Sequence, residues 1–343
     1  ATDADGEHAV GPSRSTVGRG AEVVVRRNTG FGAELITSNL FRGTSTATVM
    51  LRHDADLLGD TGSVNTNRFI VSSGAGAAPG QVPVTNNMVD PWITSRSQGQ
   101  FLKYDATLGF QIITEGGAPA NYITSAGGTL TMTANDGTEI LNLATATATL
   151  GANLDIHALR LDRDINTSAD GQFKNIIIRS GGLMQAANSP TINADLYFGS
   201  SGLGDGQALI WASNNTLQIN GKIFASEVVK SGTAFLNVRS DQAKFTGNWI
   251  INGGGIQFLT PEAASTGEVI LNGSRMNDND STYNLTEVRY NFNSGTPDLF
   301  TWNSGKITAY DINRIYLPTA GDRLQQIPDV DLRTTNAVAG SGH

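Results

Sequence analysis

Asp162 and Asp164 are the first residues in this sequence whose type and spacing could do chemistry. On a β-strand, residues two apart share one face at about 6.5 to 7 Å, within the roughly 6.5–9.5 Å that separates the acid and base of an inverting glycosidase. Arg160 and Arg163 lie beside the two carboxylates and would neutralise them. We therefore predict a solvated strand face, with polysaccharide cleavage as the open alternative.

The nucleotide-binding and serine-hydrolase motifs are incomplete. Residues 202–207, Gly-Leu-Gly-Asp-Gly-Gln, carry Gln207 where a dinucleotide-binding loop needs its third glycine, and the pattern predicts a turn. The Gly-Lys pairs at 221–222 and 305–306 lack the Ser or Thr that a phosphate loop places on magnesium, and GxSxG is absent. We predict no bound cofactor and no enzymatic activity.

Metal-binding patterns are equally weak. The chain has no cysteine, which excludes disulfides and thiolate sites, and its four histidines, at 8, 53, 157 and 343, are dispersed. The cluster Asp278-Asn279-Asp280 alternates oxygen ligands, but Tyr283 and Arg289 stand where a calcium-binding EF-hand needs glycine and glutamate. This cluster predicts a turn, and we predict no metal site.

Composition limits the partners. Only 16% of the 343 residues are charged, 40 are glycine, and the formal net charge is −8. A nucleic-acid groove needs clustered Lys and Arg, so we predict no nucleic-acid partner. No apolar stretch approaches the about 18 residues of a membrane span, so we predict no membrane insertion. The acidic start is unlike a signal peptide, although a protein whose signal had been removed would look the same.

The elements that must position any site are short strands. Runs rich in Thr, Ile, Val and Leu alternate with period two, as in 129–133, 216–219 and 236–238, and Gly, Asn, Asp and Ser separate them. Their spacing of roughly 8 to 12 residues fits a sandwich, a barrel or a solenoid, and no strict repeat is present. We therefore predict an elongated all-β fold, either an interwoven trimer or a β-solenoid-like body.

The run 144–150, Ala-Thr-Ala-Thr-Ala-Thr-Leu, has a methyl group at every second side chain. Such a strand buries little apolar area, so it is stable only where another chain or layer comes very close. This run predicts a thin, tightly wound body and favours self-association.

Composition also divides the chain. Residues 1–30 read as a loop or arm, 71–84 as a linker or long loop, and aromatic residues concentrate after 283. We predict an N-terminal attachment region at 1–80, a β-rich shaft at 81–180, a β-rich body at 181–282 and an aromatic-rich region at 283–343. Rigid aromatic side chains are good anchors at binding surfaces, so we predict receptor contacts there, with a terminal core as the alternative. The candidate contact residues are Trp302, Tyr310, Tyr290 and Tyr316.

Three segments resemble elements of bacteriophage tail fibres and related virion proteins. Residues 99–110, GQFLKYDATLGF, resemble a fibre element in which GQ-apolar-LKY(D/N) precedes an aromatic residue. Residues 137–156 are similar to a fibre shaft, and 327–332 are similar to the (I/L)-x-D-V-D-L that often precedes such elements. The resemblance implies a homotrimer with interwoven β-structure. Collagen-like repeats and coiled-coil heptads are missing from the sequence.

Together these observations predict a virion protein that binds without catalysis. Its N-terminal region would contact other virion proteins, and its C-terminal region would contact a host-surface glycan or protein. Two alternatives stay open. One is an extracellular or cell-surface bacterial or archaeal adhesin or self-assembling filament subunit, and the other is a tailspike that depolymerises polysaccharide.

Overall fold

A computed structural model describes most of the chain, and its described part is all-β, as the sequence predicts. In that part the helical content is one 3-10 turn, Pro261–Ala264, and no helix is long and apolar enough to cross a membrane. The described residues are 7–9, 14–17, 20–25, 33–53, 67–95, 99–114, 117–130, 132, 134–167, 174–213, 215–242, 245–272, 286–290, 300–301, 307–310, 313–316, 324–326 and 330–333.

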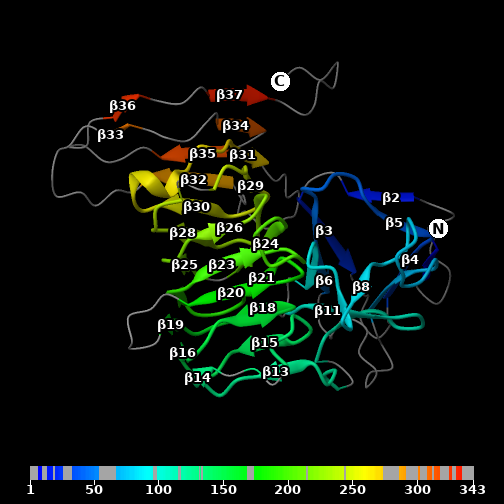
Figure 1. Cartoon of the computed structure of the whole chain (residues 1–343). Helices are drawn as coiled ribbons and strands as arrows, with labels where there is room; N and C mark the ends of the chain where they lie inside the picture. The colour runs from blue at the N-terminus through cyan, green and yellow to red at the C-terminus, as the bar shows by residue number, and fades with distance from the viewer. Residues whose placement is uncertain are drawn as a thin grey trace, which may run out of the picture.

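From Tyr122 onward the chain winds into a parallel β-solenoid (Figure 1). Each turn adds one strand to each of two long sheets, and several turns add a third strand to a shorter sheet. The first, which we call the ten-stranded sheet, contains in the described residues β13 (Tyr122–Thr124), β15 (Ile140–Leu143), β18 (Ala158–Leu161), β21 (Gly182–Gln185), β24 (Gln207–Ala212), β27 (Glu227–Ser231), β29 (Trp249–Ile251), β31 (Val269–Asn272), β34 (Ile307–Tyr310) and β37 (Val330–Arg333).

The second long sheet and the shorter sheet complete the turns. In the described residues the nine-stranded sheet contains β14 (Gly128–Leu130), β16 (Ala148–Leu150), β19 (Ile165–Thr167), β22 (Thr191–Ile192), β25 (Leu217–Ile219), β28 (Phe235–Val238), β30 (Gly255–Phe258), β32 (Thr286–Tyr290) and β35 (Asn313–Tyr316). The four-stranded sheet contains β17 (Leu154–Ile156), β20 (Asn175–Ile178), β23 (Asp195–Phe198) and β26 (Ile223–Phe224). A separate pair joins β33 (Phe300–Thr301) to β36 (Leu324–Gln326).

Turn length varies, which explains why the sequence shows no strict repeat. Hydrogen-bonded side chains on successive turns are 18 residues apart at Asn142 and Arg160 and 27 apart at Asn166 and Asn193. The strands nevertheless stay in register, because Leu141, Leu159 and Leu183 occupy one interior column. Extra residues are accommodated at the corners, where positive φ values occur at the predicted turn positions Asn135, Gly137, Gly181 and Gly202.

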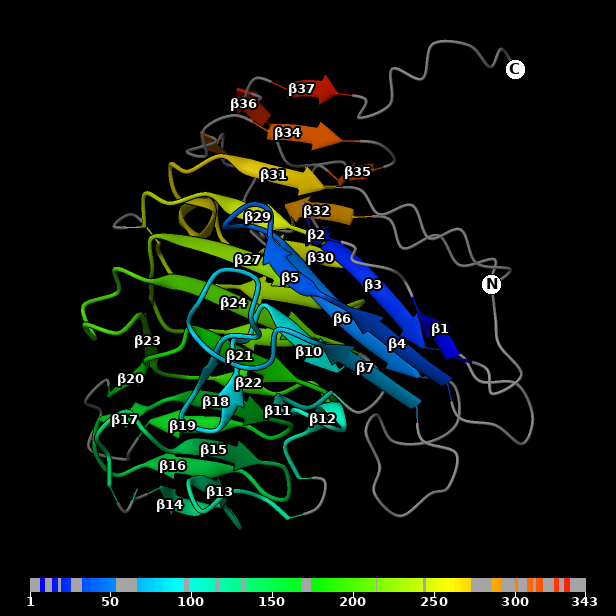
Figure 2. The same cartoon turned by 90° about the vertical axis from the view of Figure 1, so that its right-hand side faces the viewer.

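An N-terminal unit of short sheets precedes the solenoid. Parallel pairing joins β1 (Glu7–Ala9), β4 (Ala33–Thr37) and β7 (Asn67–Val71), then β3 (Gly20–Val25), β6 (Thr48–His53) and β10 (Ile93–Ser95), and finally β2 (Arg14–Val17) and β5 (Asn39–Arg42). Two hairpins complete it, β8 (Val84–Thr85) with β9 (Met88–Val89) and β11 (Leu102–Asp105) with β12 (Gly109–Ile112). Figure 2 shows this unit lying across the outer face of the ten-stranded sheet.

The two parts share apolar cores. Val49 and Trp92 of the N-terminal unit belong to the same buried cluster as Leu209, Val229 and Ile250 of the ten-stranded sheet. A neighbouring cluster joins one further set of side chains from both parts, Met88, Phe101, Ile113, Tyr122, Ile140, Ala158, Met184 and Trp211. Burial of large apolar side chains on both sides holds the unit on the solenoid, since each contributes about 1.5–3 kcal/mol.

Residues 99–110, which resemble a fibre element, form the β11/β12 hairpin. The Asp105 carboxylate accepts hydrogen bonds from the backbone N–H groups of Thr107 (2.7 Å) and Leu108 (2.8 Å) and so fixes the turn. The Tyr104 hydroxyl donates to the Val71 carbonyl and accepts from the Val71 N–H, both at 2.8 Å. These bonds attach the hairpin to the last residue of β7, an edge strand of the β1-β4-β7 sheet.

Several expectations about organisation differ from the structure. Residues 1–30 contain β1, β2 and β3 rather than only a loop or arm. The segment 71–84 forms a long loop between β7 and β8, in which Val82 is buried and the Gly80 carbonyl accepts from the Leu40 N–H at 2.9 Å. The expected boundaries near 180 and 282 interrupt no sheet, because β18 pairs with β21 and β31 with β34. The division into shaft, body and C-terminal region stays a prediction, since solenoid corners and linkers use the same small residues.

The Ala/Thr run 144–150 ends in β16, inside the solenoid. Ala148 and Leu150 are fully buried, and β16 pairs with β14 and β19 of the same chain. The close layer that the sequence predicted is therefore supplied by neighbouring turns. This strand gives no reason for a second chain, and the homotrimer stays a prediction.

Candidate functional site

The carboxylate pair does not form a solvated face, so that prediction is wrong. Asp162 is 5% exposed; its Oδ1 accepts the N–H groups of Ala186 (3.0 Å) and Ala187 (2.7 Å), and its Oδ2 lies 2.9 Å from Arg160 Nη2. Asp164 Oδ1 accepts the Thr191 N–H at 2.8 Å. Both carboxylates therefore tie one solenoid turn to the next, which the sequence could not show because the partners are backbone groups.

The C-terminal candidate residues are placed only in part. Trp302 lies outside the described residues, as do the acidic cluster 278–280 and Tyr283. Tyr290 ends β32, Tyr310 ends β34 and Tyr316 ends β35, so these three belong to the last turns of the solenoid. Their assignment as receptor contacts stays a prediction.

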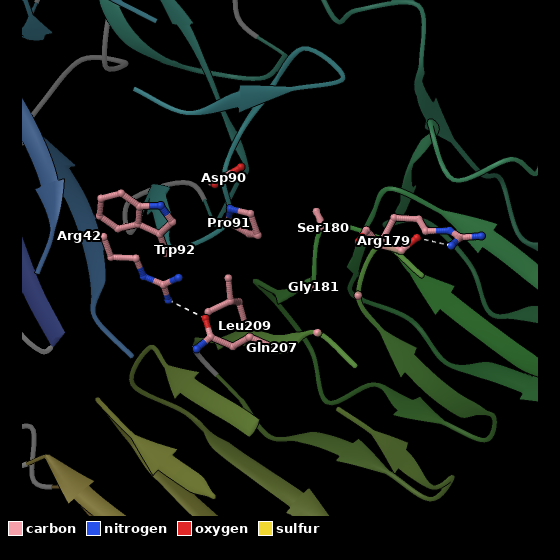
Figure 3. Close-up of a pocket in the computed structure, with 12 residues that line it drawn as sticks. Arg42, Asp90, Pro91, Trp92, Arg179, Ser180, Gly181, Gln207 and Leu209 are labelled. Atoms are coloured by element: carbon pink, nitrogen blue, oxygen red, sulfur yellow. Dashed lines mark hydrogen bonds between the residues drawn. The ribbon is translucent and has the colours of Figure 1, made fainter. Parts of the chain in front are cut away.

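A cleft of about 240 Å³ opens where the N-terminal unit meets the solenoid (Figure 3). One wall comes from Arg42 at the end of β5 and from the Asp90-Pro91-Trp92 segment between β9 and β10. The other wall comes from the solenoid corners before β21 and before β24. Its lining residues are Arg42, Asp90, Pro91, Trp92, Arg179, Ser180, Gly181, Gly199, Ser200, Gly206, Gln207 and Leu209.

Arg42 is held in a fixed position in this cleft. Its Nε donates to the Ala47 carbonyl at 2.9 Å, its Nη2 donates to Gln207 Oε1 at 2.7 Å, and its guanidinium carbon lies 5.6 Å from the Trp92 ring centroid. Burial lowers the pKa of Arg42 to about 10, while Asp90 and Glu227 oppose the shift. The guanidinium therefore stays charged at neutral pH.

The polar side chains of the solenoid wall are also held by the protein. Arg179 donates to both carboxylate oxygens of Asp155 and from Nη1 to the Ser200 carbonyl, and the hydrogen bonds that Asp155 accepts raise the pKa of Arg179. Ser180 Oγ donates to the His157 carbonyl at 2.6 Å. Such bidentate and charge-assisted contacts make the wall rigid.

Asp90 differs from these neighbours. Its backbone is fixed, since its N–H donates to the Pro83 carbonyl and its carbonyl accepts the Ile93 N–H, both at 3.0 Å. Its half-buried carboxylate, however, makes no hydrogen bond to any described residue. Burial raises the pKa of Asp90, and the charge of Arg42 opposes that rise. Asp90 therefore brings to the cleft lining a carboxylate that accepts no hydrogen bond from a described residue.

The glycine-rich segment 202–207 is a turn, as predicted, and it belongs to the loop that borders this cleft. A Cβ on Gly199 would lie 2.4 Å from the Gly206 backbone N, and Gly199 has φ +119°, so a side chain would not fit where the loop closes on itself. Leu203 on this loop is 79% exposed. Sequence reasoning identified the turn but not the site, because Arg42 and Asp90 are remote in sequence from it.

Two buried titratable residues lie outside the cleft lining. Lys230 is fully buried in an interior column between Ile210 and Ile251, and its Nζ donates to the carbonyls of Ser231 (2.8 Å), Gly232 (3.0 Å) and Gly253 (2.8 Å). Burial lowers the pKa of Lys230, whereas the three carbonyl oxygens favour its charged form. The ammonium group thus clamps two neighbouring corners.

His157 joins the solenoid to the β8/β9 hairpin. Its Nδ1 lies 3.1 Å from Asn86 Nδ2, and the ring also bonds the Thr85 backbone. Burial lowers the pKa of His157 to about 4, so the ring is neutral at pH 7. A neutral Nδ1 accepts from the Asn86 amide, which fixes the hairpin turn on the solenoid.

No group of three or more His, Asp or Glu side chains that could hold a metal ion occurs within the described ranges. No protein-family model, curated protein or solved structure matches this chain. The cleft is therefore interpreted from its own chemistry: two fixed guanidiniums, one carboxylate without a donor, and hydrogen-bonded walls.

Proposed function

We propose that this protein is a structural and host-recognition component of a bacteriophage virion, a tail fibre or tail-associated fibre, that binds without catalysis. The observation that carries the proposal is the ten-stranded parallel sheet, which runs through the solenoid and is covered on its outer face by the N-terminal unit. A solenoid with a packed interior and continuous hydrogen-bonded sheets is suited to act as a stiff rod that carries binding surfaces.

The segments that resemble fibre proteins support this proposal by their positions. Residues 99–110 form the hairpin that closes the N-terminal unit, and residues 137–156 include β15, β16 and β17. The second segment therefore amounts to one solenoid turn, the unit from which a shaft is built.

Binding is favoured over cleavage by the carboxylates. Glycoside hydrolysis in most families requires a pair of carboxyl groups about 5–9.5 Å apart. Among the residues that line the cleft, Asp90 is the only carboxylate, and both Asp162 and Asp164 are engaged by backbone N–H groups. A single carboxylate beside two guanidiniums is better suited to holding a ligand.

Immunogold electron microscopy tests the proposal. Antibodies against the purified protein are applied to particles and cells from a culture of the source organism. Gold on virion appendages supports the fibre assignment. Gold on cell surfaces, with no gold on virions, contradicts it. Light scattering of the purified protein tests the homotrimer, since a folded species of 36.1 kDa would exclude it under those conditions.

A second candidate is an extracellular adhesin or a self-assembling filament subunit. It is favoured by the single-chain solenoid, whose first turn ends in the short edge strands β13 and β14. Open edges can pair with another chain. Filaments in concentrated purified protein, together with label on cells, would support this alternative. Shortening of a surface polysaccharide by the purified protein would support the tailspike instead.

A further inference from the structure

We propose that the cleft between Arg42, Asp90 and the 199–206 loop binds one neutral sugar unit through its hydroxyl groups. This inference rests on the proposed host-recognition function and names the ligand class of that site. A cleft of about 240 Å³ is smaller than the roughly 300–1,000 Å³ of sites for drug-sized ligands, so it suits a single ring.

Asp90 determines that the ligand must carry hydrogen-bond donors. An ionised carboxylate only accepts hydrogen bonds, and this one finds no donor among the described residues, so the ligand must supply hydroxyl or amine donors. The other two charged groups of the lining, Arg42 and Arg179, are both positive and would repel a cationic amine. Hydroxyl donors remain.

The guanidiniums do not make this an anion site. Arg179 uses all three nitrogens on Asp155 and the Ser200 carbonyl, and Arg42 uses Nε and Nη2 on the Ala47 carbonyl and Gln207. Gln207 is in turn held by Glu227 Oε1 at 2.6 Å. Arg42 therefore has one terminal nitrogen left to donate, and the Asp90 carboxylate of the same lining would repel an anion.

The hydroxyl groups of a sugar supply partners for both of these groups. These hydroxyls can donate to the Asp90 carboxylate, and a sugar oxygen can accept from the remaining nitrogen of Arg42. Trp92 is 4% exposed and lies under the guanidinium of Arg42, so it supports Arg42 rather than offering a face for ring stacking. The inference thus depends on polar contacts, and Asp90 is its decisive residue.

Saturation-transfer NMR on the full chain tests the inference with glucose, galactose, mannose and N-acetylglucosamine, and with glucuronic acid and putrescine as charged probes. We expect at least one neutral sugar to bind the wild type. Asp90→Asn should weaken that binding by about tenfold or more, because a hydrogen bond to a charged group is lost. Glu262→Gln, which alters an exposed carboxylate on the 3-10 turn, should leave binding unchanged.

Thermal unfolding separates a binding role from a structural one. Since Asp90 is a half-buried charge without a hydrogen bond, Asp90→Asn should unfold at the same temperature as the wild type or at a higher one. A lowered unfolding temperature would assign Asp90 to the fold and overturn the inference, and Asp90→Ser repeats the measurement with a smaller side chain.

Other outcomes are equally decisive. Binding of none of the neutral sugars, sugar binding that Asp90→Asn leaves intact, or a preference for glucuronic acid or putrescine would each overturn the inference. Virion labelling without sugar binding would leave the fibre proposal standing alone. Sugar binding without virion labelling would leave a saccharide site on a protein of another class.

Discussion

The ten-stranded and nine-stranded sheets are built by the same turns, yet their sequences differ. Strands β15, β18 and β21 are buried at every position, whereas β16 and β25 alternate between buried and partly exposed residues. The burial patterns differ because, in the described residues, the N-terminal unit packs on the outer face of the ten-stranded sheet and not on that of the nine-stranded sheet. A strand covered on both faces loses its alternation, as in the parallel sheets of α/β proteins.

Polar residues follow the same difference. On the nine-stranded sheet the outward positions carry neutral polar side chains such as Gln218 and Asn237. On the ten-stranded sheet, Arg160 Nη1 donates to Asn142 Oδ1 at 2.8 Å. Directly after β29 of this sheet, Asn252 Nδ2 donates to the Thr46 carbonyl of the N-terminal unit at 2.8 Å. Polar side chains that the N-terminal unit covers are shielded from water, so they form specific hydrogen bonds within the protein.

Asp162→Asn should have the largest effect. Asp162 follows β18 of the ten-stranded sheet, and its loss leaves Arg160 as a buried charge without its counterion, which costs about 3–5 kcal/mol. Asp164→Asn, just before β19 of the nine-stranded sheet, removes a charged acceptor that is only partly buried and should cost about 1–2 kcal/mol. Urea unfolding of both variants measures the difference, and equal losses would contradict it.

Ile250→Ala and Gln257→Ala compare the two outer faces within one turn. Ile250 is 1% exposed beneath the N-terminal unit, so the truncation should cost about 2–5 kcal/mol. Gln257 occupies an outward position of β30, and its truncation should change the free energy of unfolding by less than about 0.5 kcal/mol. A small loss at Ile250 would mean that the N-terminal unit contributes little to the stability of the solenoid.

Acid should loosen the cover on the ten-stranded sheet through His157. Its pKa is lowered from 6.5 to about 4 by burial, so the unfolded state binds a proton at a higher pH than the folded state. Stability is therefore complete above pH 6.5 and falls as the pH drops toward 4, by about 2–4 kcal/mol. Unfolding curves of the wild type and His157→Gln between pH 7 and 4 test this, and the variant should lack this component.

Lys230→Met should have a small effect for a fully buried charge. The substitution replaces a buried ammonium with an apolar side chain of similar length in an interior column of the ten-stranded sheet, so the relieved burial of charge offsets the three lost hydrogen bonds to within about 1–2 kcal/mol. Lys230→Ala should lower the free energy of unfolding further, because it leaves a cavity in addition to the carbonyl groups without a donor. Equal unfolding free energies for the two variants would contradict this account.

The sequence predicted the fold class better than the organisation. Alternation in 216–219 and 236–238 corresponds to β25 and β28, where one face is open to solvent. Continuous apolar runs such as Trp249–Ile251 carried no periodicity, so the covered face could not be recognised from pattern alone. The cleft was missed because Arg42, Asp90 and Gln207 meet only after the N-terminal unit docks.

Turn length has a consequence for variation. Strand register is set within the sheets, whereas the residues that lengthen a turn lie at the corners, such as 199–206 between β23 and β24. Insertions or deletions at this corner would therefore alter the wall of the cleft without shifting any hydrogen-bonded pair below or above it. A solenoid of this construction can therefore change the wall of one cleft while its strand register stays the same, so related chains should differ most in the loop 199–206.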